Sequence, residues 1–178
     1  MVICGPSSSG KSTLEENLIK EYPELFHKLQ QASTRRMREG ESFGRPYIFM
    51  QDECFELFKP NLIGKLGIVE DSLFKDKYGT IPDLKSDKIN TIILAEEAII
   101  DLMNMLLDYN NLYIIGMDIN IDKIEDKNKR ENRDINFLKK ERAVLEYANI
   151  IFTNYDEDDD FVTTDEIIQI LKDIKFIE

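Results

Sequence analysis

The sequence contains only two cysteines, Cys4 and Cys54, and one histidine, His27. The cysteines form no CxxC pair and no disulfide framework, so we expect two buried thiols in a reducing cytoplasm. The lone histidine argues against a His/Cys zinc site. The N-terminus lacks a charged leader, and no segment has the roughly 20 apolar residues that span a bilayer. We therefore expect neither a signal peptide nor a membrane anchor, with Met1 beginning the fold.

Positive charge is also scarce. The chain has 23 Lys and Arg residues against 35 Asp and Glu residues, a formal net charge of −12. This balance argues against nucleic acid or an anionic membrane as a partner. An acidic chain can still bind an anionic nucleotide if its cations converge on one cleft. Internal repeats and Gly/Ser linkers are absent, and 178 residues fit a single domain, 1–178.

Short apolar runs alternate with amphipathic segments along the chain. We expect strands at residues 2–4, 47–50, 91–94, 112–115 (closed by Gly116) and 150–153. Helical periodicity is found at residues 12–22, from 96 onward, at 136–147 and at 165–174. The rest of 31–80 is polar and turn-rich, and we expect it to be irregular. Strands that alternate with helices predict an α/β fold, a parallel sheet with helices on both faces.

The strongest signal is residues 5–13, which match GxxxxGK[ST] at every position. Small residues let consecutive backbone N–H groups point inward at a phosphate chain, and the following helix adds its positive end. Lys11 is expected to reach the β- and γ-phosphates, and the Ser12 hydroxyl to ligate Mg²⁺. The expected ATP-binding residues here are Gly5, Ser8, Ser9, Gly10, Lys11, Ser12 and Thr13. We refer to residues 5–13 as the phosphate loop.

A second cluster of cations lies at residues 33–49, which contain four arginines and several aromatic rings. Guanidinium groups bind phosphate through two parallel hydrogen bonds, so this cluster suits a phosphate distinct from that of ATP. A solvated basic loop is the alternative interpretation.

The same segment resembles a known family. Residues 33–41 read Ser-Thr-Arg-Arg-Met-Arg-Glu-Gly-Glu, followed by Gly44, Tyr47 and Phe49. This is similar to the guanylate kinase pattern TTRxxRxGE…G…Y.F. Residues 68–70 (Ile-Val-Glu) and 78–80 (Tyr-Gly-Thr) resemble that family's IE and YG[ST] elements, in the same order.

The resemblance implies a P-loop kinase fold, with an inserted monophosphate-binding region at 31–82 and a short lid at 122–135. It implies an enzyme that phosphorylates a nucleoside monophosphate, GMP or dGMP before others, with ATP and Mg²⁺, as a monomer or homodimer. The acceptor phosphate would be held by Arg35, Arg38, Tyr47 and Tyr78. Glu41 and Thr80 would contact the base, and Glu70 would help to shape the base pocket. The catalytic set would be Lys11, Arg35 and the lid residues Arg130 and Arg133, with Asn154 at the ATP site.

Three positions depart from the family pattern. Gln31 replaces a serine expected to contact the base, and residues 95–97 read Ala-Glu-Glu in place of Asp-x-Asp. The arginine that starts the helix after the lid falls near Phe137. Two alternatives therefore stay open: a P-loop kinase for another acceptor, such as a different monophosphate or an antibiotic alcohol like that of chloramphenicol phosphotransferase, and a binding module without catalysis. The complete phosphate loop argues against the second.

Overall fold

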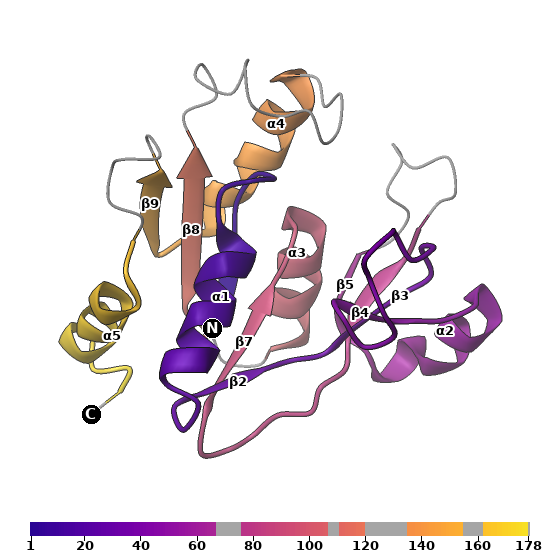
Figure 1. Cartoon of the computed structure of the whole chain (residues 1–178), viewed down its shortest axis with the longest axis horizontal. Coiled ribbons are helices and arrows are strands. Elements are labelled where there is room, and N and C mark those ends of the chain that lie inside the picture. The colour runs from indigo at the N-terminus through magenta and orange to yellow at the C-terminus, as the bar shows by residue number, and fades with distance from the viewer. Residues whose placement is uncertain (67–75, 107–110, 120–134, 155–161, 178) are drawn as a thin grey trace.

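The structure, a computed structural model, describes residues 1–66, 76–106, 111–119, 135–154 and 162–177 (Figure 1). Its main sheet has five parallel strands in the order β2-β7-β1-β8-β9. Their bounds are β1 Val2–Cys4, β2 Phe26–Lys28, β7 Ile89–Ile93, β8 Ile114–Ile119 and β9 Ile150–Asn154. In the part of the chain so described, no helix is long and apolar enough to cross a membrane.

Helices cover both faces of the main sheet. On one face, α1 (Lys11–Glu21) and α5 (Thr164–Asp173) pack on a core that includes Ile3. On the other, α3 (Glu96–Met105) and the 3-10 helix η3 (Ala143–Tyr147) pack on a core that includes Val2 and Cys4. Successive side chains of β1 thus point to opposite faces, as strand geometry requires. The expected α/β fold is confirmed.

A second, small sheet has four strands in the order β4-β3-β6-β5. Their bounds are β3 Gln31–Ser33, β4 Tyr47–Phe49, β5 Ile63–Leu66 and β6 Tyr78–Thr80. Helix α2 (Asp52–Phe58) and the 3-10 helix η1 (Lys59–Asn61) follow β4, and Phe55 of α2 anchors a separate core. The expectation that residues 31–80 are largely irregular was wrong, because strands of three or four residues are too short to show an alternating pattern.

The small sheet packs on the main domain where β5 meets α3. The backbone N–H of Lys65 donates to Asp101 Oδ2 at 2.8 Å, and the Lys65 ammonium lies 3.4 Å from the same oxygen. Gly64 has φ +52°, and a Cβ there would lie 3.2 Å from Leu94 Cδ1. The absence of a side chain therefore lets β5 approach the main sheet closely.

Three further expectations need correction. Strand β8 does not end at Gly116 but runs through it. The glycine serves close packing instead of ending the strand, because a Cβ at this position would lie only 2.8 Å from Leu145 Cδ2 of η3. The helix expected at 136–147 divides into α4 (Ile135–Arg142) and η3. Strand β2 was not expected, and Cys54, expected to be buried, is exposed on α2.

Candidate active site

The phosphate loop connects β1 to α1, as its motif requires. Gly10 caps the helix with φ +92° and Gly5 has φ +138°, backbone conformations that glycine adopts readily. A Cβ on Gly5 would lie 1.9 Å from the carbonyl oxygen of Met117 in β8, so only glycine fits. Ser8 has φ +65° although it carries a side chain. The loop is thus held tightly against the end of the main sheet.

Lys11 folds back over this loop. Its Nζ atom donates to the Pro6 carbonyl at 2.6 Å and to the Ser9 hydroxyl at 3.4 Å. Ser9 is fully buried, whereas Ser12 and Thr13 are exposed in the first turn of α1. An ammonium beside backbone amides at a helix N-terminus is an arrangement suited to a nucleotide phosphate chain.

Arg35, which follows β3, lies against aromatic rings and pairs with Glu41. Its Nη1 and Nη2 atoms donate to the two Glu41 oxygens at 2.7 and 2.5 Å, and its side chain is 9% exposed. The guanidinium carbon lies 5.0 Å from the ring centres of both Tyr47 and Phe49. Glu41 also accepts from the Arg38 backbone N–H at 2.8 Å. The guanidinium therefore has a fixed orientation. We call these five residues the Arg35 site.

Protonation states at the Arg35 site follow from these contacts. The hydrogen bonds from Arg35 lower the pKa of Glu41 from 4.5 to about 2, and the bonds to Glu41 raise the pKa of Arg35. Burial raises the pKa of Tyr47 and that of Tyr78, whose rings are 5.5 Å apart. Two protonated phenols beside a permanent cation suit a phosphate dianion.

Thr80 and Gln31 are direct neighbours across β6 and β3. Thr80 is fully buried, and its hydroxyl has no hydrogen-bond partner in the described part of the chain. Gln31 donates through Nε2 to the carbonyl of Ile93, at the end of β7, at 3.2 Å. Its amide thus bridges the small sheet and the main sheet. An unpaired buried hydroxyl is a candidate ligand contact.

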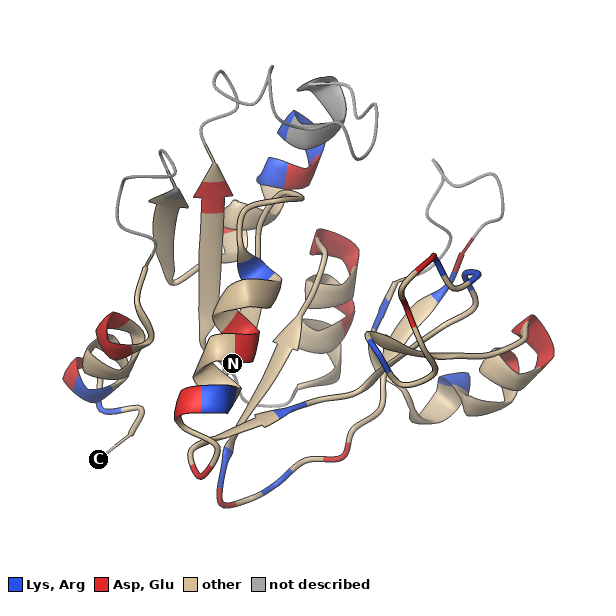
Figure 2. Ribbon diagram, in the orientation of Figure 1, with Lys and Arg blue, Asp and Glu red and all other residues tan. Residues whose placement is uncertain are grey.

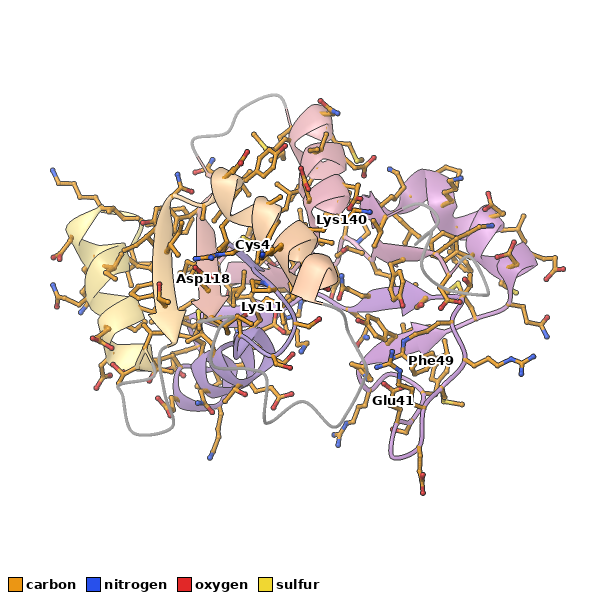
Figure 3. The ribbon with its side chains drawn as sticks, turned by 90° about the horizontal axis from the view of Figure 1, so that it is seen from above. Cys4, Lys11, Glu41, Phe49, Asp118 and Lys140 are labelled. Carbon is orange, nitrogen blue, oxygen red and sulfur yellow. The ribbon has the colours of Figure 1, made fainter. Side chains whose placement is uncertain are left out.

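The phosphate loop and the Arg35 site face each other across the molecule. Figure 3 shows Lys11 on the main-sheet side, with Glu41 and Phe49 on the small-sheet side. Figure 2 shows basic positions along the segment between β3 and β4, while acidic positions gather on α2, α3 and α5. The scarce cations thus include a group on the small sheet, as the sequence predicts.

Some expected site residues are not among those that the structure describes. Glu70, Arg130 and Arg133 lie outside the described residues, as does the expected lid except for Ile135. The backbone of Asn154 is at the end of β9, paired in register with Ile119.

Comparison with known proteins decides the family. A profile of guanylate kinase matches residues 1–178, the whole chain. The chain belongs to the guanylate kinase family. Members of this family are nucleoside-monophosphate kinases. A guanylate kinase of Chlamydia muridarum (strain MoPn / Nigg) is 30% identical over 186 aligned positions, which cover 99% of this chain and 86% of that protein.

Two further likenesses agree with this family. A guanylate kinase of Streptomyces coelicolor is 41% identical over 80 residues, 44% of this chain. The crystal structure of guanylate kinase from Anaplasma phagocytophilum matches with a TM-score of 0.66 at 20% identity, covering 99% of this chain and 85% of that one. The structural likeness supports the fold alone.

In this member of the guanylate kinase family, two contacts made by α4 were not expected from the sequence. Glu141 of α4 accepts from the Ser7 backbone N–H at 2.8 Å and from its hydroxyl at 3.1 Å. The next residue, Arg142, pairs with Asp118 of β8, with its Nε 3.0 Å from Oδ2. Glu141 and Arg142 look like surface charges of an amphipathic helix. Asp118 did carry a signal, because an acid at the carboxyl end of a buried parallel strand lies where α/β proteins bind ligands.

Proposed function

We propose that this protein transfers the γ-phosphoryl group of ATP to the phosphate of GMP or dGMP. One observation carries the proposal: a phosphate loop with its lysine and a separate guanidinium site held by Glu41 face each other on two sheets. The reaction brings together two anionic substrates, ATP and the monophosphate, and each needs a binding site of its own. The family membership agrees with this assignment.

The chemistry asks for positioning rather than a general base. An oxygen of the acceptor phosphate, already an anion, forms the new bond to the γ-phosphorus, and the bond to the β–γ bridging oxygen breaks, releasing ADP. Lys11 stabilises charge on the donor side, and Arg35 places the acceptor, with Arg38, Tyr47 and Tyr78 beside it. In the proposal, Arg130 and Arg133 add charge from the lid, and Asn154 belongs to the ATP site.

Magnesium fits the donor set on the main-sheet side. The exposed Ser12 hydroxyl is an oxygen donor at the start of α1, and Glu96 and Glu97 begin α3 directly after β7, the neighbour of β1. The described residues contain no cluster of three or more acidic, His or Cys side chains that would hold a metal alone. Ser12 would therefore share the ion with phosphate oxygens, as Mg²⁺ commonly requires. When bound, the ion neutralises charge on the transferring phosphoryl group.

We propose that Thr80, together with Glu70, selects the base of the acceptor nucleotide. The unpaired Thr80 hydroxyl supports this assignment. For Glu41, the sequence-based expectation of a base contact competes with a second role, since both of its oxygens hold Arg35 and the Arg38 amide. We propose that Glu41 positions Arg35.

A coupled assay of ADP release tests the function. The acceptors are GMP, dGMP, dTMP, AMP and an amino-alcohol antibiotic, each with Mg²⁺ and ATP. We expect turnover with GMP and dGMP well above the others. Turnover with the antibiotic alone would favour the other P-loop kinase class. The absence of turnover with all five acceptors would favour a binding module or a different acceptor.

A further inference from the structure

Helix α4 is tied to the phosphate loop and to β8 by two consecutive residues. The Glu141 carboxylate accepts both from the backbone N–H and from the hydroxyl of Ser7. Arg142 pairs with Asp118, which is 4% exposed. A bidentate contact beside a charged pair leaves the end of α4 little freedom to rotate.

These contacts close into a ring. Ser7 lies two residues after Gly5, which packs against the carbonyl of Met117, and Met117 directly precedes Asp118. The ring therefore runs from the phosphate loop to α4, to β8 and back to the loop. The orientation of α4 is fixed relative to the donor-phosphate site.

This orientation determines where Lys140 points. Consecutive helical residues are about 100° apart around the axis. Glu141 points at the loop after β1, and Arg142 points on toward β8, so Lys140 lies on the opposite side, toward β7. Strand β7 neighbours β1 on that side, and α3, which follows β7, carries the small sheet through β5. Figure 3 shows Lys140 on the side of α4 nearer the small sheet.

We propose that Lys140 is a further catalytic residue, whose ammonium contacts the transferred phosphoryl group between the phosphate loop and the Arg35 site. Lys140 is exposed and makes no hydrogen bond or ion pair to another described residue. A cation on a helix of fixed orientation lies within reach of the charge that builds up between donor and acceptor, and no partner has to be displaced for it to act. This inference rests on the proposed function.

The chain supplies a matched control. Lys139 has the same charge, is also exposed and lies on the same helix, one residue earlier. It points a further 100° or so around the axis, away from the phosphate loop. A contribution from general positive charge on α4 would be the same for both lysines, whereas direct contact with the phosphoryl group would not.

The experiment compares Lys140→Met, Lys140→Arg and Lys139→Met in the full chain, with kcat, both KM values and Tm measured for each. We expect Lys140→Met to lower kcat about 10- to 100-fold, with the KM for GMP within about two-fold. Lys140→Arg should recover most of kcat, Lys139→Met should match wild type, and no Tm should change.

Equal kcat values for Lys140→Met and Lys139→Met would overturn the inference, as would a loss confined to KM. Both results leave the proposed function intact, because wild type still converts GMP. A wild-type protein without turnover on any monophosphate would instead contradict the proposed function, and the inference with it.

Discussion

The Glu41 carboxylate holds the guanidinium of Arg35 through two parallel hydrogen bonds of 2.7 and 2.5 Å. In Glu41→Gln one oxygen is replaced by an amide nitrogen, which cannot accept. Arg35 then loses its fixed orientation, and since hydrogen bonds to charged groups contribute about 1.5–3 kcal/mol, we expect the KM for GMP to rise at least about 10-fold.

Steady-state kinetics with GMP and IMP separates the two roles of Glu41. Glu39→Gln, which removes an exposed acid of the same loop, is the control. A positioning role raises the KM for both acceptors alike, because both carry the same phosphate. A variant that keeps the KM for GMP but no longer distinguishes GMP from IMP would show that Glu41 contacts the base instead.

Glu41 also predicts how stability depends on pH. Its pKa is lowered from 4.5 to about 2 by pairing with Arg35. The stabilisation is therefore complete above pH 4.5 and is lost as the pH falls toward 2. Allowing for solvent screening, we expect wild type to lose about 1–2 kcal/mol more than Glu41→Gln across this interval. Urea unfolding at pH 5.5, 4 and 3 measures the difference, and parallel curves for the two proteins would contradict it.

Lys11→Met removes the ammonium from the phosphate loop. Because that charge is expected at the β- and γ-phosphates during transfer, we predict a loss of kcat of about 100-fold or more with a smaller change in the KM for GMP. Lys20→Met, at the exposed end of the same helix, is the control. Wild-type turnover by Lys11→Met would mean that transfer does not take place at this loop.

The two cysteines should differ in reactivity. Burial raises the pKa of Cys4 to about 11, and its thiol lies 3.7 Å from the Val144 carbonyl, whereas Cys54 is exposed. Only the thiolate reacts readily, so the native protein should titrate one thiol with Ellman's reagent and two in guanidinium chloride. Cys54→Ser should abolish the native signal. A fast reaction in that variant would show that the end of β1 is accessible.

The parts of this fold that the sequence predicts are those with a long or chemically specific pattern. The phosphate loop is recognisable because its glycines and Lys11 are required by a phosphate chain, and the helices on both faces show a 3.6-residue period. The strands of the small sheet are not recognisable, because three residues such as Gln31–Ser33 carry too little periodicity. Gly116 is instructive: a residue that commonly ends strands is here required by the close packing of η3.

The candidate site also has a part that the sequence predicts and a part that it does not. Arg35, Tyr47 and Tyr78 are predicted together because they belong to a family motif. The pairing of Arg35 with Glu41 was not predicted. The motif includes Glu41, but it does not show that both oxygens of this carboxylate accept hydrogen bonds from Arg35. Contacts such as that of Glu141 with Ser7 join residues 134 positions apart. No local pattern encodes such a pairing, because it depends on where the fold brings two segments.

The seating of β5 on α3 constrains how the two sheets approach each other. If the small sheet were connected only by its two chain crossings, it would swing freely. The hydrogen bond from Lys65 to Asp101 and the close fit of Gly64 on Leu94 instead hold β5 against the main domain. An approach of the Arg35 site toward Lys11 therefore has to carry α3 along with the small sheet or break these two contacts.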